Sequence, residues 1–189
     1  MFIKKYTLPL SIFLVHEKTF FTVWFSKNIN PNVFIYMGSD WIMSINKYLK
    51  NDVTYYNTTL IEQSAVDNKN YNIFKTNYKN NKKRFLIVFY QYYMYTIRLR
   101  LTLLLINNFN KKLKSIDSIF KSAGWLERES SEMFKVNYTN KIDIRTLLLD
   151  YSKQENPMLK DYNVEGNKEY HYSFFSEQVI FQNLNSVEL

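Results

Sequence analysis

The sequence feature that most constrains the fold is an apolar run at 84–106, RFLIVFYQYYMYTIRLRLTLLLI. Its length would suffice for a membrane-spanning helix, which needs about 20 apolar residues. However, Arg98 and Arg100 lie inside it, and each would cost about 2.5–3.5 kcal/mol at the centre of a spanning helix. Around these arginines apolar and polar residues alternate, which is typical of a strand with one polar face. The run therefore predicts two strands joined near Tyr92–Met94, and no membrane span.

The segment before this strand pair predicts a helix and a further strand. Residues 40–50, DWIMSINKYLK, have helical periodicity, and Ser39 or Asp40 could cap the helix through a side-chain oxygen. Residues 53–66 are rich in β-branched and aromatic residues, which favours a strand. The apolar face of the expected helix carries Trp41, Ile42, Ile45, Tyr48 and Leu49.

The segments on either side of the strand pair differ in character. Residues 67–83 are polar, lysine-rich and without period, so they predict a loop. Residues 114–125, KSIDSIFKSAGW, predict a second helix with Ser115 as its cap. Its inward side would carry Ile116, Ile119, Phe120 and Ala123.

Together these elements predict an α+β fold, in which a two-layer domain packs helices on a mixed sheet. The domain would span 29–125. An N-terminal extension would occupy 1–28, because its basic and then apolar sequence is interrupted by charges and lacks a cleavage site for a signal peptide. Residues 126–189 would form a docking helix and an extended C-terminal segment supported by partners.

Composition excludes several kinds of site. The chain has no cysteine, which removes disulfides, thiolate nucleophiles and cysteine-bound clusters. Only two histidines are present, and no glycine-rich loop follows a strand. We therefore expect no catalytic residue, no bound cofactor and no metal site in this chain.

Charge is divided unevenly along the chain. Residues 1–115 hold 17 basic and 5 acidic residues, a net charge of +12, whereas 116–189 carry a net charge of −4. The basic half could bind RNA through Lys82, Lys83, Arg84 and a cluster at Lys111, Lys112 and Lys114, with tyrosines stacking on bases. A basic mitochondrial RNA-binding or ribosomal protein is thus an alternative. The many Asn, Lys, Tyr, Phe and Ile residues also suggest an A/T-rich genome, such as an organellar one.

One short stretch, GWLERESSEMF at 124–134, concentrates acidic residues between aromatic ones. The simplest interpretation is a helix with an ion pair at i,i+4 between Arg128 and Glu132. A sharper one is a buried charged network at a contact between subunits. A free-standing enzyme using Asp143 and Asp150 as paired carboxylates is a third possibility, although nothing in that polar segment suggests a pocket.

The same stretch resembles a known family. It is similar to the W-x-E-R-E-x-x-D/E-M-F signature of the 30 kDa subunit of respiratory complex I, called NADH dehydrogenase subunit 9 in mitochondria and the C subunit in bacteria. DIRTLLLDY at 143–151, NPMLKDY at 156–162 and GNKEYHY at 166–172 resemble later motifs of that family. The detailed match covers 125–172, and a looser one covers 33–189. Where the family has glycine after M-F this chain has Lys135, and where it has His-Pro this chain has Lys141-Ile142.

The resemblance implies a non-catalytic core subunit of the matrix arm, on the matrix side of the mitochondrial inner membrane. Its partners would be other complex I subunits, above all the quinone-site and cluster-bearing ones, and flavin and iron–sulfur clusters would belong to those neighbours. It implies no nucleic acid and no direct membrane span. Lack of a typical presequence suggests that the gene is mitochondrial. The predicted interface comprises Trp125, Glu127, Arg128, Glu129, Glu132, Phe134, Asp143, Arg145, Asp150, Tyr151, Pro157, Lys160 and Asp161.

Overall fold

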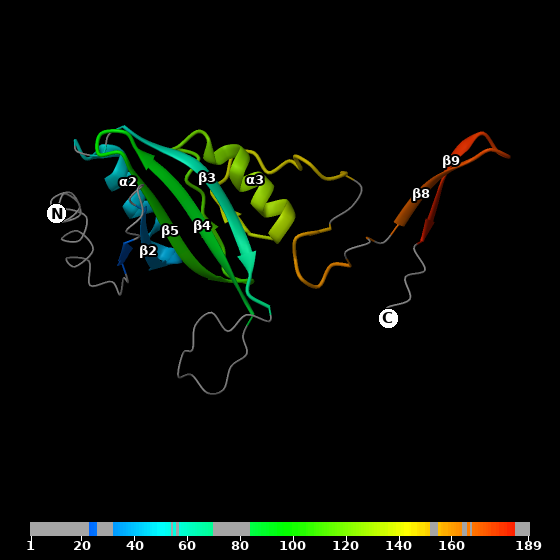
Figure 1. The fold of residues 1–189 in the computed structure, drawn as a ribbon, viewed down its shortest axis with the longest axis horizontal. Helices are drawn as coiled ribbons and strands as arrows, with labels where there is room; N and C mark the ends of the chain where they lie inside the picture. The colour runs from blue at the N-terminus through cyan, green and yellow to red at the C-terminus, as the bar shows by residue number, and fades with distance from the viewer. Residues whose placement is uncertain are drawn as a thin grey trace, which may run out of the picture.

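The computed structural model describes residues 23–25, 32–53, 55, 57–69, 84–151, 155–163, 166 and 168–183. Its centre is a five-stranded sheet in the order β1-β2-β5-β4-β3 (Figure 1). The strands are β1 (Val23–Phe25), β2 (Asn32–Gly38), β3 (Thr58–Asp67), β4 (Phe85–Met94) and β5 (Leu99–Asn108). β2 runs parallel to β5, while the other neighbours are antiparallel, so the sheet is mixed.

The long apolar run forms two strands, as its alternation predicts. Leu99, Leu101 and Leu103 are buried, whereas Arg100 is exposed on the opposite face of β5. The turn was misplaced, because β4 continues through Met94 and the connection is Tyr95–Arg98. Arg98 has a φ of 49°, in the left-handed region that closes a tight connection. Among the described residues, no helix is long and apolar enough to cross a membrane.

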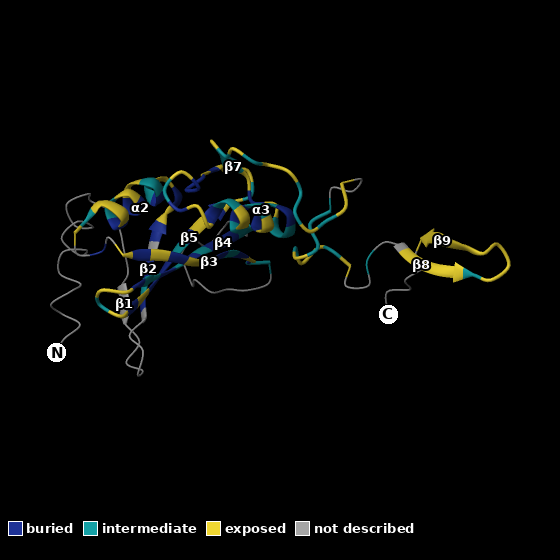
Figure 2. Cartoon of the chain, turned by 90° about the horizontal axis from the view of Figure 1, so that it is seen from above, coloured by how far each residue is buried: buried dark blue, intermediate teal, exposed yellow. Residues whose placement is uncertain are grey.

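Two helices cover one face of the sheet (Figure 2), which confirms the α+β two-layer fold. A short 3-10 turn, η1 (Ser39–Trp41), leads into α2 (Ile42–Asn51), and α3 (Ala123–Phe134) follows later. Ile42, Ile45 and Leu49 are buried, as expected for the inward side of α2. The expected cap is wrong, because neither Ser39 nor Asp40 caps either element with its side chain.

The predicted helix at 114–125 is wrong, although its inward residues are right. Residues 117–122 form successive turns, and α3 begins at Ala123. Ile116, Phe120 and Ala123 are nevertheless buried. Backbone N–H groups of Phe120 and Ala123 donate to the carbonyls of Ile116 and Phe120, so consecutive turns reproduce a helix-like spacing. The predicted domain boundary after residue 125 falls inside α3.

The remaining segments depart from the prediction in smaller ways. The strand expected at 53–66 is β3 and begins later, at Thr58. Nearly all of the expected loop at 67–83 and most of the extension at 1–28 lie outside the described residues. β6 (Leu113–Lys114) pairs in parallel with β7 (Tyr138–Thr139).

The C-terminal segment is not simply extended. β8 (Lys168–Ser173) and β9 (Gln178–Asn183) form an antiparallel hairpin that the sequence patterns did not predict. Figure 1 shows this hairpin away from the sheet and from both helices.

Candidate functional site

The acidic stretch forms α3, which packs on β3 and supplies one wall of the candidate site. Helical spacing places Ala123, Glu127 and Ser130 on the side that faces the sheet, where all three are buried. The hydroxyl of Ser130 donates to Oε1 of Gln63 on β3 (3.0 Å), and Nε2 of Gln63 donates to the hydroxyl of Tyr138 (2.8 Å). The helix is therefore attached to the sheet by polar as well as apolar contacts.

Glu127 lies at the centre of a buried network. Its carboxylate accepts hydrogen bonds from the hydroxyl of Ser115 (2.6 Å) and the backbone N–H of Ile116 (2.9 Å). Nζ of Lys141 lies 3.1 Å from Oε2 and also donates to the carbonyl of Gly124 (3.0 Å). Burial raises the pKa of Glu127 above its ordinary value, and the N–H, hydroxyl and ammonium donors only partly offset that effect.

The segment after α3, residues 135–151, crosses back over the helix, and we call it the strap. The side chain of Arg128, on α3, binds the backbone of the strap. Its guanidinium donates to the carbonyls of Arg145 (2.8 Å) and Thr146 (3.0 Å) and to the carboxylate of Asp143 (3.2 Å). The same guanidinium lies 5.2 Å from the centre of the Trp125 ring.

Glu132, one turn further along α3, holds the next part of the strap. Its two carboxylate oxygens accept the backbone N–H groups of Leu147 and Leu148, the latter at 2.9 Å. These residues of the strap form no strand or helix, so the side chains of α3 satisfy backbone groups that secondary structure would otherwise pair. The acids and the arginine of α3 therefore act as a clamp on an irregular segment.

The end of α3 coincides with one departure from the family pattern. Lys135 has a φ of 59°, and its N–H donates to the carbonyl of Ser131 (3.0 Å), which is a left-handed C-terminal cap. Glycine, which the family has at this position, adopts that conformation without steric cost. The backbone carbonyls of Glu132 and Met133 accept hydrogen bonds from the side chain of Asn156 and from the backbone N–H of Met158, at 2.5 and 3.1 Å.

A second cluster attaches residues 155–163 to the ends of β3 and β4. Asp67 is buried and accepts from Nε of Arg84 (3.0 Å) and from the backbone N–H of Lys160 (3.1 Å). Asp161 forms ion pairs with Arg84 and with Lys69. Burial works to raise the pKa of Asp67, but the Arg84 guanidinium and the backbone donors outweigh it and hold that pKa below its ordinary value.

The predicted interface residues divide by exposure. Glu127 is fully buried, so its contacts lie within this chain. Those that are buried or half-buried are Glu127, Arg128, Glu132, Phe134, Asp143 and Pro157. Those that are exposed are Trp125, Glu129, Arg145, Asp150, Tyr151, Lys160 and Asp161. The structure brings most of the first group together around the strap, and contact with a partner remains a prediction for both groups.

The sequence patterns did not predict the roles of several strap residues, both those that face α3 and those that face outward. In the sequence, Lys141 stands out only as a departure from the family pattern, yet it is the cation of the buried pair. Ile142 and Ile144 are 84% and 82% exposed, and Leu148 is also exposed. The available signal was apolar residues placed in a charged segment without helical period. The strap thus turns its backbone toward α3 and several apolar side chains outward.

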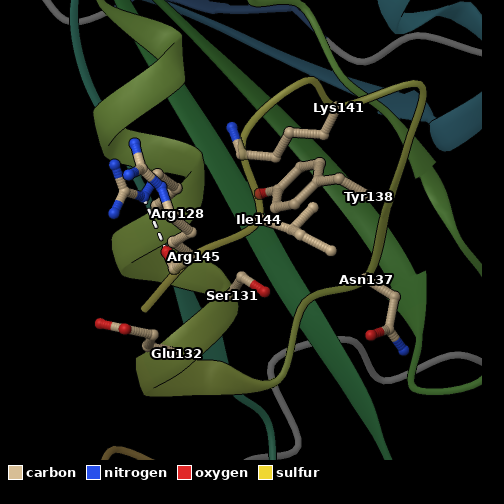
Figure 3. Close-up of a pocket in the computed structure, with 8 residues that line it drawn as sticks. All are labelled: Arg128, Ser131, Glu132, Asn137, Tyr138, Lys141, Ile144 and Arg145. Carbon is tan, nitrogen blue, oxygen red and sulfur yellow. Dashed lines mark hydrogen bonds between the residues drawn. The ribbon is translucent and has the colours of Figure 1, made fainter. Parts of the chain in front are cut away.

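A cavity between α3 and the strap is a candidate for a small-molecule site (Figure 3). Its volume is about 210 Å³, below the roughly 300–1,000 Å³ of typical ligand sites. Its lining consists of Arg128, Ser131, Glu132, Asn137, Tyr138, Lys141, Ile144 and Arg145. Because Arg128, Glu132 and Lys141 already bind groups of this chain, the cavity offers little charge for a ligand.

Some of the residues behind the alternative functions are paired within this chain. Hydrogen bonds from Arg145, with help from Arg128, hold the pKa of Asp143 well below its usual range, so this carboxyl is unsuited to general acid catalysis. Arg84 is paired with Asp67, and Lys111 with Asp40 at 2.9 Å. Lys82 and Lys83 lie outside the described residues. Within the described ranges, no group of three or more His, Asp or Glu side chains could hold a metal ion.

Comparison with known proteins agrees with the resemblance seen in the motifs. NADH-ubiquinone oxidoreductase subunit 9 of Paramecium primaurelia is 29% identical over 190 residues, which span 98% of this chain and 88% of that protein. The C subunit of NADH-quinone oxidoreductase from Roseobacter denitrificans is 29% identical over 150 residues, or 78% of this chain and 68% of that protein.

Solved structures show the same fold at low identity. A chain of the membrane-bound sulfane sulfur reductase, an archaeal respiratory membrane complex, has a TM-score of 0.60 at 14% identity, and the match covers 82% of this chain and 84% of that one. The trypsin-resistant fragment (1-134) of Nqo5 has a TM-score of 0.52 at 15% identity, covering 72% and 98%. The family model for the 30 kDa subunit of respiratory-chain NADH dehydrogenase matches residues 35–168, and the chain belongs to that family.

Proposed function

We propose that this chain is a non-catalytic core scaffold subunit of the matrix arm, or quinone-reducing module, of NADH:ubiquinone oxidoreductase. In this role it supports electron transfer from NADH to ubiquinone coupled to proton pumping, while the electrons pass through its neighbours. The relatives named above are subunits of NADH-ubiquinone and NADH-quinone oxidoreductases, which supports membership of such a complex.

The observation that carries the proposal is the orientation of the strap. Arg128 and Glu132 bind its backbone, and this leaves Ile142, Ile144 and Leu148 exposed. Exposed apolar side chains on an ordered segment are typical of a surface that a partner covers. The exposed Trp125 and Tyr151 add aromatic groups of the kind that dominate binding energy at interfaces.

The proposal also assigns partners and location. The partners are other matrix-arm subunits, especially those that bear iron–sulfur clusters or form the quinone site. Flavin and clusters belong to those subunits, and this chain supplies no catalytic residue. The location is the matrix side of the mitochondrial inner membrane, with the gene in the mitochondrial genome. Subunit 9 of Paramecium tetraurelia, 27% identical over 98% of this chain, is among the relatives that support a mitochondrial place.

A pair of matched substitutions tests the proposal. Ile144→Lys places a charge on the strap at an 82% exposed position, and Val53→Lys places the same charge at an 83% exposed position after α2. Neither side chain is part of the core, so both variants should fold. Gently solubilised membranes are run on a native gel, stained for NADH oxidation, and the chain is located by mass spectrometry.

We expect the wild-type chain and Val53→Lys in the large NADH-oxidising band, and Ile144→Lys depleted from it by tenfold or more. Normal assembly of Ile144→Lys would show that the strap is not a contact. If the wild-type chain instead runs with ribosomes, the basic half is the functional one and the scaffold proposal is wrong.

A further inference from the structure

Residues 155–162 form a compact turn that closes on itself, and we call this segment the brace. Backbone N–H groups of Leu159 and Tyr162 donate to the carbonyls of Asn156 (3.1 Å) and Leu159 (3.0 Å). The hydroxyl of Tyr162 donates to Oε2 of Glu155 at 2.6 Å, which joins the two halves of the segment. Leu159 is half-buried and packs against the hydrophobic core. The brace is therefore a folded element, although it contains neither helix nor strand.

One end of the brace meets the end of α3, beside which Figure 1 shows it in orange. The last carbonyls of a helix have no partner within that helix and need donors from elsewhere. Nδ2 of Asn156 donates to the carbonyl of Glu132 at 2.5 Å. The backbone N–H of Met158 donates to the carbonyl of Met133 at 3.1 Å. These acceptors are present as soon as α3 forms, so this end of the brace requires no other protein.

The other end of the brace meets an acceptor at the adjoining ends of β3 and β4. The side chain of Asp67 is 1% exposed, and its carboxylate accepts hydrogen bonds from the backbone N–H of Lys69 (2.9 Å) and Nε of Arg84 (3.0 Å). The backbone N–H of Lys160, 93 residues further along the chain, donates to the same carboxylate at 3.1 Å. Lys69 and Arg84 thus orient Asp67 independently of the brace.

The side chains of Lys160 and Asp161 add further contacts at this end. Nζ of Lys160 donates to the carbonyl of Lys69 at 2.8 Å. The carboxylate of Asp161 forms ion pairs with Lys69 and Arg84. Exposed ion pairs each contribute little to stability, so these charges mainly fix which residue of the brace meets Asp67.

We infer that the brace closes in the free chain, without any partner, and that Lys160 and Asp161 hold this chain's own fold. The contacts that close it lie within this chain, so the inference goes beyond the proposed function and does not depend on it. The sequence patterns instead predicted a segment that partners support. A segment that is already ordered loses less conformational entropy on binding, so the brace would reach an assembly as a preformed surface.

Amide hydrogen exchange of the purified full-length chain, followed by NMR, tests this inference. The amides of Met158 and Lys160 are compared with the same amides in a synthetic peptide of residues 155–163, which lacks the acceptors at both ends. The amide of Leu113, which donates to the carbonyl of Asn137 at 2.8 Å, reports whether the domain itself is intact. Because the isolated chain is used, the result does not depend on which assembly the chain joins.

Two double variants identify the contacts responsible. Asn156→Ala with Asp161→Ala removes one side-chain contact from each end of the brace, at a half-buried and an exposed position. Asn51→Ala with Glu129→Ala is the matched control, which removes an amide and a carboxylate from exposed positions on α2 and α3.

We expect the amides of Met158 and Lys160 in the free wild-type chain to exchange at least about tenfold more slowly than in the peptide. The brace double variant should lose most of that protection, and the control should keep it. Equal exchange in the wild-type chain and the peptide would overturn the inference, because the brace would then stay open until a partner binds. Protection that survives the brace double variant would also overturn it.

A single variant decides the case in which the brace double variant also speeds exchange of Leu113 and so destabilises the whole domain. Asp161→Asn removes only an exposed carboxylate, and Glu129→Gln is its matched control. Exchange of Lys160 that is at least about twofold faster in Asp161→Asn, with Leu113 unchanged, supports the inference. Equal exchange of Lys160 in these two variants overturns it.

Discussion

Glu127 and Lys141 form an ion pair in which Oε2 and Nζ lie 3.1 Å apart and the two side chains are 0% and 4% exposed. Both charges have left water, so each depends on the other and on neighbouring donors and acceptors. The pair joins α3 to the strap, fourteen residues apart in sequence. The pair therefore stabilises this chain internally, and its loss should lower the free energy of unfolding.

Removing only the cation should be costly. In Lys141→Met the carboxyl of Glu127 stays buried without its ion partner, which should lower the free energy of unfolding by about 3–5 kcal/mol. Urea denaturation measures this change. Lys121→Met, at an exposed lysine before α3, is the matched control and should change stability by less than about 0.5 kcal/mol.

The double variant Lys141→Met with Glu127→Gln should recover much of that loss. An amide can still bond to Ser115 and to the backbone of Ile116 without a buried charge. Additive losses in the double variant would mean that the two residues act independently, contrary to the buried-pair account.

The pKa of Glu127 sets a pH dependence of definite sign. Burial raises that pKa above the ordinary 4.5, so the folded state binds more protons than the unfolded state between 4.5 and the raised value. The contribution of this carboxyl to stability is therefore full below pH 4.5 and is lost as pH rises. Compared with Glu127→Gln, the wild-type chain should lose stability as urea denaturation is repeated from about pH 4 to about pH 8. If the free energy of unfolding of the wild-type chain instead rises relative to that of Glu127→Gln as pH increases, the ammonium of Lys141 lowers the pKa of Glu127 by more than burial raises it.

Glu132→Gln should loosen the strap. The carboxylate accepts two backbone N–H groups, and an amide oxygen replaces it with one uncharged acceptor. Hydrogen bonds to a charged group contribute about 1.5–3 kcal/mol, so the amides of Leu147 and Leu148 should exchange at least about tenfold faster. Glu129→Gln, at an exposed glutamate on the same helix, should leave their exchange unchanged. If the amides of Leu147 and Leu148 exchange equally fast in the two variants, Glu132 does not hold the strap on α3.

Lys135→Gly should stabilise the chain. A φ of 59° costs a non-glycine residue about 1–2 kcal/mol, and the greater freedom of glycine in the unfolded state takes back part of the gain. We expect a net increase of about 0.5–1 kcal/mol in the free energy of unfolding, measured by urea denaturation. Lys135→Ala keeps a Cβ in the left-handed region and should give no increase. If Lys135→Gly and Lys135→Ala raise the free energy of unfolding equally, the stabilisation comes from loss of the ammonium group and not from the backbone conformation.

Parts of this arrangement follow from local patterns. Alternation around Arg100 identifies a strand because a period of two puts the charge on one face and leucines on the other. The periodicity of 40–50 identifies α2 and its buried side for the same reason. At 114–125 the helical spacing correctly predicts the buried residues but wrongly predicts a continuous helix, because consecutive turns share the spacing of a helix.

Local sequence patterns predict the strand pair, the inward side of α2 and, through ordered motifs, the family. What the acids of α3 bind depends on tertiary packing. Glu127 meets Lys141 and Glu132 meets the backbone of Leu148 because the chain turns back over the helix after Lys135. Such partners are set by packing between distant segments, and no local period encodes them. For the same reason, the outward position of Ile144 became visible only when the strap was placed on α3.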